Sequence, residues 1–326
     1  MKVAMIAMPL PSLTDIEAAA RLVYDEFPAT PQYRWQLISE RVGADCWIKH
    51  ENHTPVGAFK IRGGLTYFAH MAARNALPAE VISATRGNHG QSIAWAARKY
   101  GVRCTIVVPH GNSVEKNAAM RTLGANLIEH GDDFQAAREQ AIALAQTTGA
   151  HMVPSYHPDL VSGVSTYWWE FLRAVPHMQT AYVPIGLGSG ACAAVAAKLA
   201  LQHPVKIVGV ISTGATTYRD SIAAGEVVEA TVSTTLADGM AVRRADPAAL
   251  SILRQYLDRI VAISDAEVAN AMHLLFTDTH NVAEGAGAAA LAAALQEKTQ
   301  IASQTVGLAL TGGNVDAPVF AQVLQS

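Results

Sequence analysis

The chain has 326 residues, of which half are hydrophobic and 16% are charged, a composition typical of a compact globular protein with one large or two ordinary domains. Its 24 Lys and Arg residues and 27 Asp and Glu residues give a net charge of −3. Because no block of like charge is present, we expect no nucleic-acid partner. Charged residues such as Arg98 and Lys198 interrupt the alanine-rich stretches, so no run reaches the roughly 18 apolar residues of a membrane span.

The amino terminus and the cysteines carry no targeting or cross-linking pattern. The start, MKVAMIAMPLPSL, has one early lysine, but Pro9 and Pro11 end its short apolar run and no small-residue cleavage site follows, so we expect no export signal. Cys46, Cys104 and Cys192 are an odd number of widely spaced residues without a CxxC pair, which suggests neither a disulfide framework nor a zinc site. These features fit the reducing cytoplasm.

Short runs of β-branched residues predict strands near residues 47–48, 81–82, 105–108, 127–128, 183–185, 205–211, 260–263 and 306–310. Strong helix formers predict helices at 92–100, 134–147, 191–201, 266–276 and 286–295, and one short helix after Gly313. This alternation predicts an α/β fold with mostly parallel sheets. We expect residues 78–157 to form a small mobile domain, and residues 1–77 and 158–326 to form a large one.

Three predicted strands lead into polar, glycine-rich loops that open a helix, and in a parallel sheet such loops gather at the carboxyl edge, where ligands bind. The first loop is SATRGNHG at residues 83–90. Its glycines allow close approach of the backbone, Thr85 and Asn88 offer donors, and the helix begun near Gly90 points amide groups at a ligand, so an anion is the expected guest. Taken alone, the loop is better interpreted as an ordinary capped turn.

The second loop, PIGLGSGA at residues 184–191, joins a strand to an alanine-rich helix, an arrangement that binds phosphate on backbone amides. It also fits the dinucleotide fingerprint GxGxxA, which requires an acidic residue about 20 positions later. The next strand ends instead in Ser212 and Thr213, which favours a phosphate without a ribose. The third loop, LTGGN at residues 310–314, also joins a strand end to a glycine turn. Taken alone, it is weak evidence for a ligand site.

The segment GAFKIRGG at residues 57–64 contains a candidate reactive lysine. Lys60 lies between Phe59 and Ile61, so a partly apolar pocket would lower its pKa and allow it to form a Schiff base. The alternative, favoured when the segment is taken alone, is that Lys60 and Arg62 are solvated charges on an exposed helix face. Together, an imine-forming lysine, a phosphate-binding loop and polar loops at a sheet edge are what pyridoxal phosphate requires.

With these residues in view, the sequence resembles the fold type II pyridoxal-phosphate family that includes threonine and serine dehydratases, serine racemase and cysteine synthase. The resemblance covers nearly the whole chain. Its segments, in order, are GAFKIRGG, TRGNHGQ, VPHGNSVEKNAAMRTLGA, GLGSG and LTGGN. It implies a two-domain fold like the tryptophan synthase β subunit, with mostly parallel twisted sheets flanked by helices, and a homodimer.

The resemblance also implies a role for each matching residue. Lys60 would form the Schiff base, with Phe59 against the pyridine ring, and Thr311 would meet the pyridine nitrogen. Glu284 in EGAGAAA matches a carboxylate near the ring. Asn88 would hold the ring hydroxyl. The residues implied around the cofactor phosphate are Gly186, Leu187, Gly188, Ser189 and Gly190. Those implied at the substrate are Thr85, Arg86, Asn88 and His89, with the substrate carboxylate bound by Thr85 and neighbouring backbone amides.

A hydroxyl at the pyridine nitrogen favours elimination, because Thr311 gains no charge pairing from a protonated ring. We therefore expect Lys60 to take the α-proton of a β-hydroxy amino acid as general base. The β-hydroxyl then leaves, with a proton from the cofactor phosphate as the family resemblance suggests, and hydrolysis yields a 2-keto acid and ammonia.

Several residues depart from the family pattern. Leu187 and Ser189 stand where many relatives have glycine. Arg86 stands where the serine racemase pattern has a second base, and arginine is too fully protonated to accept a proton. Ile211 and Thr217 replace the carboxylates that hold a cation in that pattern, so we predict no metal there.

Ile61 fits the dehydratase side of the family, because cysteine synthases carry an acidic residue after the lysine. Without a regulatory extension the chain resembles the short catabolic dehydratases, in a branch similar to those named for hydroxyectoine use or for phenylserine. The substrate stays open among threonine, serine, hydroxyaspartate and phenylserine. Two segments, YHPD at residues 156–159 and TYWW at residues 166–169, are candidates for a pocket wall, although aromatic residues at helical spacing are more often core. The rival activities are racemisation, β-replacement and a nicotinamide-dependent oxidoreductase.

Overall fold

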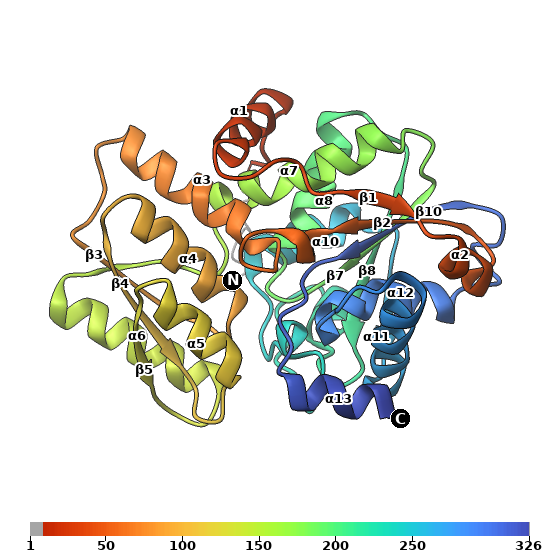
Figure 1. Cartoon of the computed structure of the whole chain (residues 1–326). Coiled ribbons are helices and arrows are strands. Elements are labelled where there is room, and N and C mark those ends of the chain that lie inside the picture. Colours follow the sequence, from red (N-terminus) through yellow and green to blue (C-terminus); the bar gives the residue numbers. More distant parts are fainter. Residues whose placement is uncertain (1–8, 326) are drawn as a thin grey trace.

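A computed structural model describes residues 9–325 of the chain, so most of the run tested as an export signal lies outside the described residues. The fold contains two sheets (Figure 1). The larger one has six strands in the order β1 (Gln32–Arg34), β2 (Asp45–His50), β10 (Thr305–Leu310), β7 (Thr180–Pro184), β8 (Lys206–Ser212) and β9 (Arg259–Ile263). The smaller one has the order β5 (Asn126–Glu129), β4 (Arg103–Val108), β3 (Glu80–Ala84) and β6 (His151–Met152).

Every strand pair is parallel except β1 with β2, so the predicted α/β fold with mostly parallel sheets is confirmed. Each predicted strand overlaps an observed one. The four strands of the smaller sheet all lie within residues 78–157. The division into a large domain and a small mobile domain stays a prediction.

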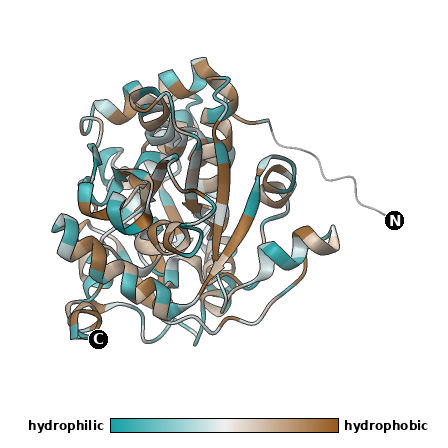
Figure 2. Ribbon diagram, turned by 90° about the vertical axis from the view of Figure 1, so that its right-hand side faces the viewer, coloured by the Kyte–Doolittle hydropathy of each residue, from teal (hydrophilic) through white to brown (hydrophobic). Residues whose placement is uncertain are grey.

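Helices cover both faces of the larger sheet. The helices α11 (Asp265–Thr279) and α12 (Gly285–Gln296) pack on one face, and α7 (Pro158–Ala174), α8 (Ser189–Ala200) and α10 (Pro247–Tyr256) on the other. Strand residues alternate between the two cores: Cys46 and Ile48 pack with α12, whereas Trp47 packs with the opposite layer, as the two-residue period of a strand requires. Figure 2 shows these strands as a hydrophobic interior.

The smaller sheet is also a sandwich, between α4 (Asn88–Lys99) on one face and α6 (Phe134–Thr148) on the other. The remaining helices are α1 (Leu13–Tyr24), α2 (Gln36–Val42), α3 (Lys60–Ala73), α5 (Val114–Thr122), α9 (Thr217–Ala224) and α13 (Ala317–Gln325), with short 3-10 turns η1 (Glu51–His53) and η2 (Asp238–Met240). The short helix expected after Gly313 is α13.

Helix α3 joins the two halves of the molecule, because it contacts both α4 and α7. A Cβ atom at Gly163 of α7 would lie 2.1 Å from the carbonyl oxygen of Arg62 in α3, so the two helices touch backbone to backbone. This contact fixes the start of α3, where Lys60 lies.

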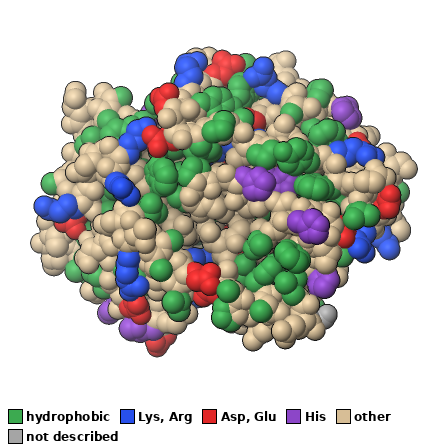
Figure 3. All heavy atoms as spheres, viewed as in Figure 1, with side chains coloured by type: hydrophobic (Ala, Val, Ile, Leu, Met, Phe, Trp, Pro, Cys, Tyr) green, Lys and Arg blue, Asp and Glu red, His purple; other side chains and the backbone are tan. Residues whose placement is uncertain are grey.

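On the face seen in Figure 3, Lys and Arg side chains are interspersed with Asp and Glu, and no basic patch of the kind that binds nucleic acid covers it. None of the helices in residues 9–325 has the length and apolar character that crossing a membrane demands.

Candidate active site

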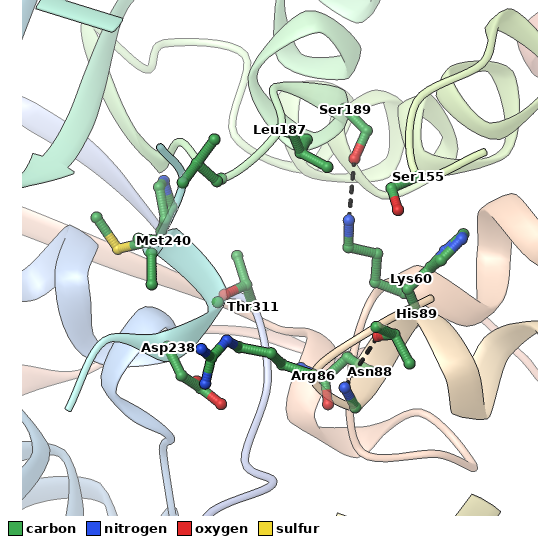
Figure 4. Close-up of a pocket in the computed structure, with 18 of the residues that line it drawn as sticks. Lys60, Arg86, Asn88, His89, Ser155, Leu187, Ser189, Asp238, Met240 and Thr311 are labelled. Carbon is green, nitrogen blue, oxygen red and sulfur yellow. Dashed lines mark hydrogen bonds between the residues drawn. The ribbon is translucent and has the colours of Figure 1, made fainter. Parts of the chain in front are cut away.

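A pocket lies where the carboxyl ends of β3, β7 and β10 face each other between the two sheets (Figure 4). The loops after these three strands and the start of α3 form its wall, as expected for a parallel sheet edge. All the predicted site residues line it: Phe59, Lys60, Thr85, Arg86, Asn88, His89, Gly186, Leu187, Gly188, Ser189, Gly190, Glu284 and Thr311.

Lys60 is the first residue of α3 and points its amine into this pocket. The Nζ atom donates a hydrogen bond to Ser189 Oγ at 3.3 Å and lies 5.2 Å from the centre of the Phe59 ring. Burial lowers the pKa of Lys60 to about 8, against a smaller opposing effect of the Glu284 carboxylate. At pH 7 roughly a tenth of this amine is therefore unprotonated and nucleophilic.

Arg62 is 0% exposed, so the alternative of two solvated charges on an exposed helix face is wrong. Its guanidinium lies 2.7 Å from Glu51 and 2.6 Å from Glu170, and Lys49 lies 2.6 Å from the other oxygen of Glu170. Two cations and two carboxylates thus form a neutral buried cluster under the first turn of α3. Such clusters are tolerated because every charge is paired.

The loop after β3 is ordered by its own side chains and by the larger sheet. Thr85 Oγ1 accepts a hydrogen bond from the Gly87 amide at 2.9 Å. Asn88, the first residue of α4, donates to Glu284 at 2.6 Å and accepts from Asn314 at 2.9 Å. Burial lowers the pKa of His89 to about 3, with a further contribution from Lys60, so the imidazole is neutral at physiological pH.

The glycine loop after β7 meets the pocket at the first turn of α8. Gly188 precedes this helix with a φ of 99°, a conformation that favours glycine. A Cβ atom at Gly186 would lie 2.4 Å from the carbonyl oxygen of Gly239, so the loop also packs too closely for a larger residue. The first amides of α8 have no partner within the helix, and such groups suit an anion.

Two charged residues of the pocket were not predicted from the sequence, Lys116 of α5 and Asp238 of η2. Lys116 Nζ lies 2.9 Å from Asp238 and 3.0 Å from Glu284. Burial opposes the charge of Lys116, but the two carboxylates outweigh it and raise its pKa. Burial raises the pKa of Glu284, against the effect of Lys116. Lys116 stands in VPHGNSVEKNAAMRTLGA, one of the segments that carry the family resemblance, so that segment could have pointed to it.

The model of the pyridoxal-phosphate dependent enzymes matches residues 23–312. The chain belongs to this family. An L-threonine ammonia-lyase of Thermotoga maritima is 31% identical over 315 residues, covering 96% of this chain and 78% of the relative. An L-threo-3-hydroxyaspartate ammonia-lyase of Saccharomyces cerevisiae is 30% identical and covers 97% of both chains. The structure of maize serine racemase superposes with a TM-score of 0.88 at 26% identity, over 97% of this chain and 98% of that one.

The pocket of this pyridoxal-phosphate enzyme fits its cofactor. An amine with a lowered pKa, a helix start with free amides and an aromatic ring beside the amine are all directed at one space. Tyr167 and Trp168 do not line it; both are fully buried in the core between α7 and α8. The described residues hold no group of three or more His, Cys, Asp or Glu side chains placed to bind a metal ion.

Proposed function

We propose that the protein catalyses the β-elimination of water from a β-hydroxy amino acid such as L-threonine or L-serine, giving a 2-keto acid and ammonia. The observation that carries this proposal is the amine of Lys60, whose pKa burial lowers to about 8, at the point where the three strand-end loops meet. Two relatives that span most of this chain are named as ammonia-lyases of β-hydroxy amino acids.

In this proposal Lys60 binds the cofactor aldehyde, and Phe59 packs against the pyridine ring. The amides of residues 186–190 bind the phosphate, Asn88 donates to the ring hydroxyl, and Thr311 meets the ring nitrogen. The substrate carboxylate binds Thr85 and the amides at the start of α4. Glu284 holds Asn88 through a 2.6 Å hydrogen bond and thereby orients it.

When bound, pyridoxal phosphate withdraws electrons from the substrate and so makes the proton on its α-carbon acidic. Lys60 Nζ takes that proton, which requires the neutral amine that burial favours. Thr311 Oγ1 makes a long hydrogen bond of 3.4 Å to the carbonyl oxygen of Ala286, a weak contact that its proton can leave for the ring nitrogen. As a neutral hydroxyl, Thr311 does not stabilise a protonated ring nitrogen as a carboxylate would. This favours loss of the β-hydroxyl over transamination.

Racemisation needs a second base on the side of the substrate opposite Lys60. Arg86 occupies the corresponding loop position, and a guanidinium does not accept a proton near neutral pH. Chiral analysis of the product from L-serine separates the two reactions: pyruvate and ammonia support our proposal, and D-serine as the main product contradicts it.

The central experiment is reduction of the holoenzyme with borohydride, followed by peptide mass spectrometry and by a 2-keto acid assay over the four candidate substrates. We expect the cofactor adduct on Lys60, with its absorbance lost on reduction. An unmodified Lys60, or equilibrium binding of NAD in place of pyridoxal phosphate, contradicts the proposal.

We infer in addition that the protein works as a homodimer in the cytoplasm and that residues 78–157 move as a unit when substrate binds. Its three cysteines are buried and unpaired in the described chain, which suits a reducing compartment. Sedimentation velocity tests the dimer, and hydrogen exchange with and without substrate tests the motion.

A further inference from the structure

Arg86 lies in the loop between β3 and α4, and its side chain extends into the pocket toward Asp238, away from the amine of Lys60 (Figure 4). Its Nε atom is buried and makes no hydrogen bond. A buried donor without an acceptor costs free energy. The arginine therefore has an unsatisfied donor, and it is one of the residues that line the pocket.

No carboxylate within residues 9–325 pairs with Arg86. The acid toward which it points, Asp238, is 2.9 Å from Lys116, which also holds Glu284 at 3.0 Å. The nearby acids thus already have a cation, while the guanidinium of Arg86 has none. A planar guanidinium binds a carboxylate through two parallel hydrogen bonds, and this pairing is stronger in a partly apolar pocket than in water.

The position of Arg86 decides which part of a substrate it meets. In the proposed function the α-amino group would reach the cofactor aldehyde held at Lys60, and the α-carboxylate would bind the amides at the start of α4. The guanidinium extends away from Lys60, toward Asp238 (Figure 4). The part of the substrate left to contact the guanidinium is therefore a group attached to its β-carbon.

We propose that Arg86 is a specificity residue that binds a second carboxylate, on the β-carbon, so that the preferred substrate is a dicarboxylic β-hydroxy amino acid such as 3-hydroxyaspartate. This inference rests on the proposed elimination reaction and names its substrate class. Loss of the α-proton and of the β-hydroxyl, followed by hydrolysis, converts 3-hydroxyaspartate to oxaloacetate and ammonia, with the water lost in the first stage recovered in the second.

The test compares kcat/KM of the holoenzyme for 3-hydroxyaspartate, serine, threonine and phenylserine, in the wild type and in Arg86→Gln and Arg86→Lys. We expect 3-hydroxyaspartate to be the best substrate of the wild type. Its kcat/KM relative to serine should fall about 10- to 100-fold in Arg86→Gln, the loss expected for a charged hydrogen-bonded pair, and less in Arg86→Lys, which keeps the charge. Arg219→Gln, at an exposed arginine outside the pocket, should leave the ratio unchanged.

A binding experiment removes catalysis from the comparison. Calorimetric titration of the holoenzyme with succinate and with butyrate, two chains of equal length, measures how much a second carboxylate adds to the binding affinity. We expect succinate to bind more tightly to the wild type, and the difference to disappear in Arg86→Gln.

Equal losses of kcat/KM for serine and 3-hydroxyaspartate in Arg86→Gln would overturn the inference, because Arg86 would then bind the α-carboxylate common to both. Preference of the wild type for phenylserine or threonine would overturn it as well. These results leave the elimination reaction standing, whereas absence of keto acid from all four amino acids removes the proposed function itself.

Discussion

Lys116 and Glu284 form an ion pair with a separation of 3.0 Å, and their side chains are 6% and 4% exposed. Lys116 belongs to α5 beside the smaller sheet, whereas Glu284 directly precedes α12 on the larger one. The pair therefore joins the two halves of the molecule across the pocket. Lys116 also forms an ion pair with Asp238, so one ammonium group pairs with two carboxylates.

Replacing Lys116 by methionine should lower the free energy of unfolding by about 3–5 kcal/mol, because Glu284 would remain as a buried carboxylate without its cation. Urea denaturation measures the loss. The double variant Lys116→Met/Glu284→Gln should be more stable than the sum of the single changes indicates, since no buried charge is left unpaired. Lys99→Met, at a more exposed pair with Glu26, is the control and should cost about 1 kcal/mol or less. Simple additivity of the two changes would argue against coupling.

Arg62→Met should destabilise the fold by a similar amount, about 3–5 kcal/mol. Glu51 would lose its cation, while Glu170 would keep Lys49. Arg103→Met, at an exposed pair with Glu80, should change stability by about 1 kcal/mol at most. Thermal and urea unfolding of both variants, compared with wild type, provide the measurement. Equal stability of the two variants would show that the cluster under α3 is not an important source of stability.

The reactivity of Lys60 should depend on pH with a midpoint near 8. Burial lowers its pKa from 10.5 to about 8, so the neutral amine, which alone forms an imine, increases about tenfold per pH unit below the midpoint and levels off above it. The rate at which apoprotein and pyridoxal phosphate form a borohydride-reducible adduct reports this, with Lys60→Ala as the blank. A rate that keeps rising to pH 10 would indicate an amine with its ordinary pKa.

Gly188→Ala should lower both stability and affinity for the cofactor phosphate. The residue has a φ of 99°, and an added Cβ would lie 2.6 Å from the Cβ of Ala249 and 2.9 Å from Tyr218 Oη. Backbone strain and steric overlap together should cost about 2–4 kcal/mol. Gly101→Ala, with a φ of 67° and no atom within 4 Å of the new Cβ, isolates the backbone contribution of about 1 kcal/mol. Urea unfolding measures the loss of stability in both variants, and cofactor titration measures the loss of affinity.

The sequence predicted the strands and the three loops well, because both leave local signals. Each β-branched run became a strand, and each glycine loop after a strand became a wall of the pocket. The strands β1 and β6 were missed because they have only three and two residues, too few for an alternating pattern. Helix α7 was missed because its segment VSGVSTYWW consists of β-branched, small polar, glycine and aromatic residues, all of which have lower helix propensity than alanine or leucine.

The ion pairs between residues far apart in the chain could not be predicted from the sequence. Arg62 reads as a solvated residue until Glu170, 108 positions away, is brought beside it. Lys116 likewise stands 122 residues from Asp238. Periodicity and turn chemistry describe neighbours along the chain, whereas these pairs exist only after the two sheets meet.

The two walls of the pocket have separate origins in the fold. The loop with Arg86 and Asn88 follows a strand of the smaller sheet, whereas Lys60, the glycine loop and Thr311 are attached to α3 and the larger sheet. A substitution confined to Arg86 would therefore alter the choice of substrate through the smaller sheet alone. The groups carried by α3 and the larger sheet would keep their positions, and so would Asn88, which Glu284 and Asn314 hold from the larger sheet.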